Sequence, residues 1–359
     1  MRGESVQRSA VDALTLLSLP RIGLREWHRR VRAAGSVAAA LSDERRNPAL
    51  APAVGKAEAA VHAAELIGAA IAVHGSAEYP AVLNDLTESD SAGLTPAPPV
   101  LFALGSIALL GKPTVALVGT RQATAPGLRA AERIARECAE AGALVISGLA
   151  RGIDAAAHTG ALNGSGTTAA VIGTGLDVAY PVDHRALQQR IAECGVVLTE
   201  LAPGQRATRG SFPERNRLIA ALAHVTIVVE AGHKSGALLT ANAAMALNRL
   251  CAAVPGTFDS ASCLGSNELL RDGAHVIASV NDVLALLQIP QARERYTIAP
   301  DALNDAERAI WNVLGSAPLD LDLVVQRAGW AAEACLSAVT TLELKGLVRA
   351  THNGALQRA

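Results

Sequence analysis

The sequence has few aromatic residues and few lysines. Aromatic side chains account for 3% of the 359 residues, and only four of the 32 basic residues are lysines, so arginine supplies most of the positive charge. Arginine suits bidentate contacts with phosphate, but an arginine-rich composition also follows from a GC-rich coding genome. The 33 acidic residues nearly cancel the basic ones. Any surface for nucleic acid must therefore be a local patch.

Cysteines and long apolar runs are also scarce. The five cysteines are scattered and form no Cys-x-x-Cys pair, which argues against a disulfide framework and against a structural zinc site. No apolar run approaches the ~18 residues of a membrane span, and the N-terminus lacks the pattern of a signal peptide. We therefore expect a cytoplasmic protein without a membrane segment.

The patterning divides the chain into three parts. Residues 1–74 have apolar residues at helical spacing and a net charge of +3, which predicts a small helical domain. Residues 75–290 begin with a connecting region in which 100–102 form a possible strand. They then alternate short apolar runs with helical segments, the pattern of an α/β fold with a doubly wound, mostly parallel sheet. The predicted strands are 115–119, 143–147, 168–172, 196–199, 225–229 and 251–254, and the predicted helices are 127–141, 152–162, 184–193, 214–222 and 236–248.

Residues 300–359 predict a winged helix. Three helical patterns, at 305–315, 319–328 and 332–345, precede two short extended runs joined at Asn353-Gly354, and Asn-Gly is a strong hairpin signal. The net charge of this part is −2. A winged helix without a basic face favours contact with a protein over reading of DNA.

Small residues follow nearly every predicted strand. In an open α/β sheet, ligands bind beyond the carboxyl ends of the strands, where glycines let a ligand approach the backbone amides. The residues at these ends include Gly119-Thr120-Arg121, Ser147-Gly148, Gly173-Thr174-Gly175, Glu200, Glu230 and Ser235-Gly236. For each glycine alone a simple turn former is the better explanation, but their concentration predicts a phosphate-binding surface.

The familiar nucleotide motifs are incomplete. Val178 follows Gly173-Thr174-Gly175 where a dinucleotide fingerprint has its third glycine. Lys234-Ser235 lacks the first glycine of a P-loop, because Val228 stands there. A conventional dinucleotide or ATP site is disfavoured, and we expect no cofactor.

The segment 205–217 carries the most informative combination of residues. Four arginines against Glu214 give it a net charge of +3: Arg206, Arg209, Arg215 and Arg217. Phe212, one of three phenylalanines in the chain, lies among them, and Asn216 follows. A basic loop with a planar ring predicts a site for single-stranded nucleic acid, where a base stacks while arginine holds phosphate. The alternatives are that Phe212 packs on the core and that Asn216 caps a turn.

Asp154 and His158 share one helix face at i, i+4 spacing and could form a catalytic pair. No nucleophile or second carboxylate obviously joins them, and an Asp in a first helical turn commonly caps amides. Structural roles are therefore favoured for both.

Taken in order, these motifs resemble the DNA-processing protein A (DprA, also called Smf) family. The resembling segments are VALVGTR at 115–121, SGLARGIDAAAH at 147–158, GALNGSGTTAAVIGTGLDVAYP at 160–181, FPERNRLIA at 212–220, VVEAGHKSGALLTA at 228–241, VPG at 254–256 and GSNELLRDGA at 265–274. The resemblance covers about 75–285 and implies a Rossmann-like domain at 75–290. More weakly, it implies a helical domain of the SAM or helix-hairpin-helix type at 1–74 and a winged helix at 300–359.

The resemblance also implies a function. Such a protein is not an enzyme; it binds and protects single-stranded DNA during natural transformation and helps to load the recombinase RecA. It also implies a homodimer that pairs through about 264–280. The DNA-binding residues predicted from the motifs and strand ends are Gly119, Thr120, Arg121, Ser147, Gly148, Arg209, Phe212, Arg215, Asn216, Arg217, Ser235 and Gly236.

Two other functions compete with this one. Nucleotide phosphoribohydrolase-like enzymes share the broad Rossmann class but carry a PGGxGT loop, whereas here Pro255-Gly256-Thr257 runs directly into Phe258. The third possibility is an adaptor that acts mainly through its winged helix.

Overall fold

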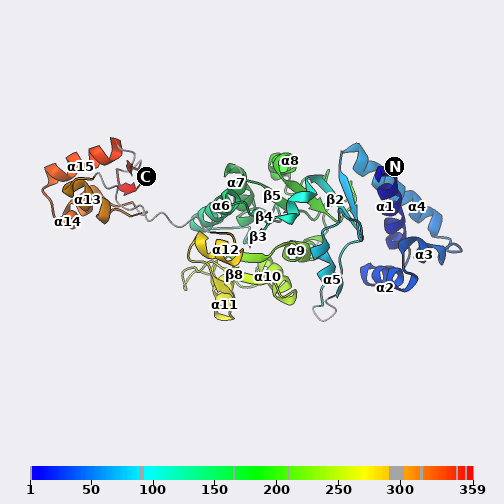
Figure 1. The fold of residues 1–359 in the computed structure, drawn as a ribbon. Coiled ribbons are helices and arrows are strands. Elements are labelled where there is room, and N and C mark those ends of the chain that lie inside the picture. The colour runs from blue at the N-terminus through cyan, green and yellow to red at the C-terminus, as the bar shows by residue number, and fades with distance from the viewer. Residues whose placement is uncertain are drawn as a thin grey trace. The chain divides into compact units, whose positions relative to one another are not determined.

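The computed structural model describes residues 2–88, 93–164, 166–208, 210–290, 303–315, 318–344, 347–351 and 354–358. The chain forms two compact units, residues 1–290 and residues 291–359 (Figure 1). None of the helices within the described ranges is both long enough and apolar enough to cross a membrane.

The first unit is built on one mixed sheet. The strands, in chain order, are β1 (Ala70–Val73), β2 (Val100–Gly105), β3 (Thr114–Gly119), β4 (Leu144–Ser147), β5 (Thr168–Val171), β6 (Val196–Thr199), β7 (Val225–Glu230), β8 (Leu250–Ala253) and β9 (His275–Val276). Their order across the sheet is β1-β2-β6-β5-β4-β3-β7-β8-β9. The pairs β1–β2 and β2–β6 are antiparallel, and all the other pairs are parallel. The prediction of a doubly wound, mostly parallel sheet is confirmed.

The predicted strands agree with β3 to β8 to within one residue at either end. These strands are buried on both faces and therefore read as continuous apolar runs, a clear signal in a sequence. β1 and β9 were not predicted. β9 has only two residues, and both are exposed. Neither a run of strand length nor an alternation of apolar and polar residues therefore indicates it in the sequence.

Helices cover both faces of the sheet (Figure 1). The helices that follow β3 are α6 (Ala125–Glu140), α7 (Ile153–Asn163), α8 (Arg185–Cys194), α9 (Ser211–Leu222), α10 (Gly236–Ala246), α11 (Leu264–Arg271) and α12 (Val280–Leu286). On one face, α6, α7 and α12 pack over Val115 and Leu117 of β3. On the other, α9 to α11 pack over Ala116 and Val118. Alternate side chains of one strand thus enter two cores.

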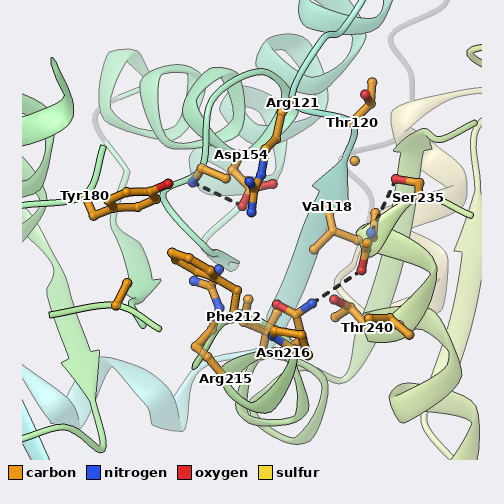
Figure 2. Close-up of a pocket in the computed structure, with 18 of the residues that line it drawn as sticks. Val118, Thr120, Arg121, Asp154, Tyr180, Phe212, Arg215, Asn216, Ser235 and Thr240 are labelled. Carbon is orange, nitrogen blue, oxygen red and sulfur yellow. Dashed lines mark hydrogen bonds between the residues drawn. The ribbon is translucent and has the colours of Figure 1, made fainter. Parts of the chain in front are cut away.

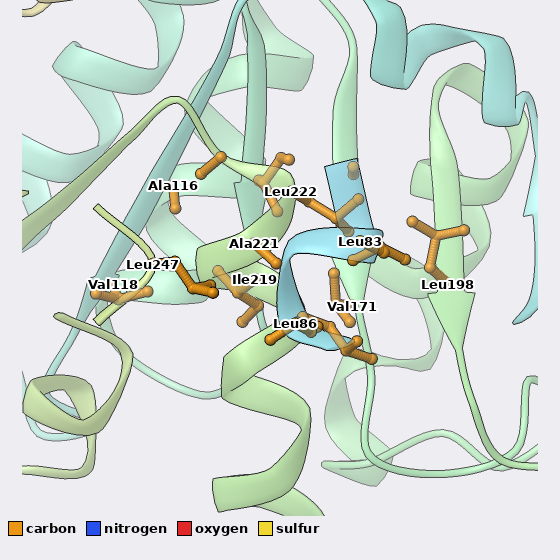
Figure 3. Close-up of a cluster of buried hydrophobic side chains, with 14 of the residues drawn as sticks. Leu83, Leu86, Ala116, Val118, Val171, Leu198, Ile219, Ala221, Leu222 and Leu247 are labelled. Atoms are coloured by element: carbon orange, nitrogen blue, oxygen red, sulfur yellow. The ribbon is translucent and has the colours of Figure 1, made fainter. Parts of the chain in front are cut away.

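α9 is covered on both sides, by the sheet and by a short segment that precedes β2. This segment contains the 3₁₀ turn η1 (Ala81–Asn84) and the short helix α5 (Asp85–Glu88). Leu83 and Leu86 lie over Ile219 and Leu222 of α9, as Figure 3 shows. Residues 218–222 are consequently all buried. Truncating a fully buried leucine such as Leu86 to alanine costs about 2–5 kcal/mol.

The N-terminal helices share a core with the sheet. They are α1 (Arg2–Ser18), α2 (Leu24–Ala34), α3 (Val37–Ser42) and α4 (Leu50–Leu66). Leu16 and Trp27 belong to the same buried cluster as Phe102 of β2, Ile172 and Leu176. Residues 1–290 therefore group as one compact unit, and the predicted domain boundary near residue 74 stays a prediction.

The second unit has the elements of a winged helix. α13 (Asp305–Val313), α14 (Leu321–Ala328) and α15 (Ala332–Leu344) are followed by the antiparallel pair β10 (Val348–Ala350) and β11 (Leu356–Arg358). Arg358 donates to the carbonyl oxygen of Trp311 at 2.6 Å and lies over its ring, 4.5 Å from the centroid. This contact ties the hairpin to α13. Asn353 of the predicted turn lies outside the described residues, and Gly354 has a positive φ of 81°.

Candidate nucleic-acid interface

A cavity of about 840 Å³, here called the crest cavity, lies at the carboxyl ends of the central strands (Figure 2). Eight of the predicted site residues line it: Gly119, Thr120, Arg121, Phe212, Arg215, Asn216, Ser235 and Gly236. They come from the β3–α6 loop, from α9 and from the start of α10, segments up to 117 residues apart. The cavity therefore lies where an open α/β sheet places its ligand.

The N-terminus of α10 opens into the crest cavity. Ser235 is its N-cap residue, and its hydroxyl accepts a hydrogen bond from the Ala237 amide at 3.4 Å. Asn216 of α9 donates through Nδ2 to the Gly236 carbonyl oxygen, also at 3.4 Å. The first turn of a helix offers unpaired amides and a partial positive charge. This corner of the cavity can therefore accept an anion such as phosphate.

The β3–α6 loop is held rigidly beside the cavity. A Cβ atom on Gly152, where φ is 78°, would lie 2.3 Å from the Thr120 carbonyl oxygen, so only glycine fits there. Thr124 caps α6, and its hydroxyl donates to the buried Glu230 carboxylate at 2.6 Å. Arg121, on this loop, is exposed, and within the described parts of the chain it forms no ion pair, although its charge interacts with the buried Asp154 carboxyl group. Its guanidinium can reach a ligand in the cavity.

Phe212 is half-buried and packs on three sides. The Tyr180 ring lies with its centroid 5.0 Å away and tilted by 36°, and Cζ of Arg121 lies 5.4 Å from the Phe212 centroid. Below the ring, a Cβ atom on Gly173 would lie only 3.2 Å from Phe212 Cδ1. The remaining surface of the ring faces the crest cavity (Figure 2). Phe212 thus packs against its neighbours and also lines the cavity, and its stacking on a base stays a prediction.

Arg215 and Asp154 build the floor of the cavity. Arg215 is buried and donates to the carbonyl oxygens of Gly148, at 2.7 Å, and Val171. Asp154 accepts from the amides of Gly148 and Ala150 at 3.1 and 3.3 Å. Burial raises the pKa of Asp154 and lowers the pKa of Arg215 to about 10, so Arg215 remains charged at neutral pH. Its charge interacts with the Asp154 carboxyl group beside it.

His158 does not join Asp154 in a reactive pair. The imidazole is fully buried, and its Nδ1 lies 2.8 Å from the Thr168 hydroxyl. Burial lowers the pKa of His158 to about 3, so the ring is neutral at physiological pH. The structural roles favoured for both residues are the ones that the structure shows.

Two predicted site residues do not reach the cavity. Arg217 has 3% of its side chain exposed; it forms an ion pair with Glu200 and donates to the Pro96 carbonyl oxygen at 3.1 Å. Ser147 is fully buried, and its hydroxyl donates to the Leu117 carbonyl oxygen at 2.6 Å. Both side chains are thus engaged inside the protein, because α9 is covered on both sides and Ser147 ends a buried strand; the contact of these two residues with DNA stays a prediction.

The two other predicted residues have separate outcomes. Gly148 is buried under Arg215: a Cβ atom there would lie 2.5 Å from Nη1 of Arg215. It lines a smaller cavity beside the crest cavity. Arg209 lies outside the described residues, so its proposed contact with DNA stays a prediction.

Tyr180 is the main site residue that sequence reasoning missed. It lies 32 residues before Phe212, on a different loop, and no local pattern indicates that the two rings meet. The only feature of the sequence that could have drawn attention to Tyr180 is that the chain has just three tyrosines. Leu239 and Thr240 of α10 also line the crest cavity and carried no signal.

A doubly wound sheet with an amide-lined crest, an exposed arginine and two adjacent aromatic rings defines a Rossmann-like protein suited to a ligand that has both phosphate and planar groups. The chain belongs to the DNA recombination-mediator protein A family, whose model matches residues 70–288. A model of the DprA winged helix domain matches residues 296–354.

Curated relatives and solved structures agree with this assignment. A Mycobacterium tuberculosis protein named "Putative DNA processing protein DprA" is 41% identical over 257 residues, which are 70% of this chain and 66% of the relative. The crystal structure of DprA from Streptococcus pneumoniae superposes with a TM-score of 0.61 at 33% identity, covering 79% of this chain and 95% of that one. DprA from Helicobacter pylori, described for its single-stranded DNA binding mode, superposes with a TM-score of 0.54 at 30% identity over 62% of this chain and 96% of that one.

Proposed function

We propose that this protein binds single-stranded DNA with little sequence preference and takes part in DNA processing during natural transformation. The observation that carries the proposal is the crest cavity, where the exposed Arg121 lies beside Phe212 and opposite the N-terminus of α10. An arginine and helix amides bind backbone phosphates, while an accessible ring stacks on an unpaired base. Paired bases in a duplex do not expose their faces, so the arrangement favours a single strand.

The relatives support the same proposal. The Streptococcus pneumoniae protein is named DNA processing protein A, and the Helicobacter pylori structure is described for its single-stranded DNA binding mode. This chain spans 66% of the length of the Mycobacterium tuberculosis relative. That this chain shares the function of the whole relative is therefore part of our proposal.

A mobility shift comparing single-stranded and duplex DNA of equal length tests the proposal. We expect clearly tighter binding to the single strand, with similar affinities for strands of different sequence. Equal or tighter binding to duplex DNA would exclude the proposed function.

The proposal includes a binding role and no catalytic one. The two residues considered for acid–base chemistry are already engaged, Asp154 with backbone amides and His158 within the core. The competing enzyme function predicts release of a base or phosphate from nucleotides. Incubation of the protein with nucleoside monophosphates and chromatography of the products distinguishes the two.

We further propose a cytoplasmic homodimer that helps to load RecA. The region predicted to pair, about 264–280, contains the edge strand β9, and Leu264 and Val276 in it are exposed apolar side chains. An open strand edge next to exposed apolar residues is suited to pairing with a second chain. Light scattering gives the mass in solution. RecA filament assembly on single-stranded DNA, with and without the protein, tests the loading role.

Two features of the winged helix favour contact with a protein partner. Trp330 and Leu336 are exposed in this unit, and its net charge is −2. Deletion of residues 300–359 should therefore leave binding to single-stranded DNA intact while it weakens binding to a protein partner such as RecA. An adaptor that acts mainly through this unit would instead retain its function when the crest cavity is altered.

A further inference from the structure

A smaller cavity of about 270 Å³, here called the Tyr180 cavity, adjoins the crest cavity. The two cavities share Arg121, Tyr180 and Phe212, and the Tyr180 cavity continues past Tyr180 to Pro181 and Val182. One continuous surface thus runs from the start of α10, across Phe212, to Tyr180. The two cavities are therefore close enough for one extended ligand to lie along both.

Two exposed apolar side chains, Tyr180 and Val182, line one part of the Tyr180 cavity. Tyr180 is 47% exposed and Val182 is 67% exposed, although the tyrosine also packs against Phe212. Figure 2 shows the Tyr180 ring projecting above Phe212, on the side of the cavity where Arg121 lies. An exposed aromatic ring beside an exposed aliphatic side chain offers a flat apolar surface that a planar ligand can cover.

The segment that carries Tyr180 is anchored at several points. The Thr174 hydroxyl donates to the Val178 carbonyl oxygen at 2.7 Å, and Gln188 Nε2 donates to the Leu176 carbonyl oxygen at 2.8 Å. His184 Nδ1 lies 2.9 Å from the Leu149 carbonyl oxygen, which joins the segment to the loop after β4. The ring is therefore positioned before a ligand arrives, and little ordering is needed on binding.

The charges divide the surface into a phosphate position and a base position. Arg121 stands at the junction of the two cavities, exposed and with no ion pair in the described part of the chain. Arg151, at the far rim, forms an exposed ion pair with Asp183 at 2.7 Å. The arginine at the junction forms no ion pair, whereas the one at the far rim is offset by Asp183, beside the apolar side chains of Tyr180 and Val182.

We propose that Tyr180 and Val182 form a second base-binding subsite, an inference that rests on the proposed binding of single-stranded DNA. One protomer then holds two successive unstacked bases, one against Phe212 in the crest cavity and the next against Tyr180. Arg121 contacts the phosphate between them. Each aromatic contact of this kind changes affinity by about five- to a hundredfold.

Three substitutions of Tyr180, titrated with a fluorescein-labelled oligothymidylate, test the subsite. Tyr180→Phe keeps the ring and should bind within about twofold of the wild type. Tyr180→Leu keeps an apolar cover over Phe212 but removes the ring, and Tyr180→Ala removes both; each should lose about five- to a hundredfold in affinity. The dependence on salt should stay constant, since no phosphate contact is removed.

A variant away from the ring keeps the test independent of the packing on Phe212. Val182→Glu adds a negative charge at a solvent-exposed position of the Tyr180 cavity and should weaken binding at least fivefold. Leu66→Glu adds the same charge at an exposed residue that lines neither cavity, and serves as the matched control. Melting temperatures of all variants, measured without DNA, report on folding.

The outcomes separate the subsite from the proposed function. If Tyr180→Leu binds as Tyr180→Phe does, or if Val182→Glu binds as Leu66→Glu does, the second subsite is overturned, while binding by the wild type still supports the proposed function. If the wild type itself does not bind the oligothymidylate, the proposed function fails and the subsite fails with it.

Discussion

Arg217 of α9 and Glu200 after β6 form an ion pair with a 2.7 Å contact that is largely closed off from solvent. The same guanidinium donates to the carbonyl oxygens of Thr95 and Pro96. One side chain therefore joins α9, the end of β6 and the segment that leads into β2. Arg217, which we expected from the sequence to contact DNA, instead holds in place α9, the helix that also carries Phe212.

Replacement of Arg217 should reduce stability more than binding. Arg217→Ala leaves the Glu200 carboxylate and two carbonyl oxygens without their donor, and breaking a buried pair in this way costs about 3–5 kcal/mol. Urea denaturation should show the loss, while protein that remains folded should bind single-stranded DNA nearly as the wild type does. A stable Arg217→Ala protein with weakened binding would instead place this arginine in the interface.

Arg121 should account for one phosphate contact. For single strands, each contact contributes about −0.7 to the slope of log K against log salt concentration. Arg121→Ala should therefore weaken binding and make the slope shallower by about that amount. Arg190→Ala, which removes an exposed arginine of α8 that lines neither cavity, is the matched control and should change neither quantity. Loss of affinity at an unchanged slope would contradict a direct contact with phosphate.

Phe212 should affect both binding and stability, since its ring is half-buried. Phe212→Ala removes the stacking surface, which is worth roughly 1–3 kcal/mol of binding, together with part of the packing against Gly173 and Tyr180. Phe212→Leu keeps most of the packing volume and removes only the ring. We expect the leucine variant to melt within a few degrees of the wild type and yet bind single-stranded DNA at least about fivefold more weakly. Wild-type affinity in Phe212→Leu would show that the ring acts only in packing.

His158 should make the protein less stable in acid. Burial lowers its pKa from 6.5 to about 3, so between these values the unfolded chain binds a proton that the folded protein does not. The free energy of unfolding therefore falls as the pH drops below about 6, by up to about 1.4 kcal/mol per pH unit from this residue.

Urea denaturation at pH 7.5, 5.5 and 4.5 measures the contribution of His158. In His158→Gln, the amide group can still donate to the Thr168 hydroxyl, but it takes up no proton. The free energy of unfolding of His158→Gln should therefore fall less steeply as the pH drops over this range. Its unfolding takes up as much as one proton fewer than unfolding of the wild type. The raised pKa of Asp154 acts in the opposite direction, but it is common to both proteins and cancels in the comparison. Parallel pH profiles would mean that His158 is not buried in its neutral form.

The sequence was most informative where one local pattern decides the outcome. β3 to β8 and the helices between them follow from apolar runs of strand length that alternate with helical segments. Arg121 and Phe212 were found because a glycine-rich strand end and a basic loop mark them directly. Arg217 and Tyr180 were misjudged or missed because their roles depend on remote partners. Nothing near residue 217 shows that Glu200 and residues 95–96 will enclose it, and nothing near residue 180 shows that its ring will meet Phe212.

The shared core of α1 to α4 and the sheet has a practical consequence for anyone who wishes to shorten this protein. A chain that starts at residue 75 would lose β1 and would leave Phe102, Ile172 and Leu176 without the helices that shield them from water. Such a fragment should be poorly soluble, and a failure to bind DNA would then reflect aggregation and not a missing contact. Residues 1–290 form a compact unit by themselves, so a shortened form of this protein should retain the N-terminal helices and end near residue 290.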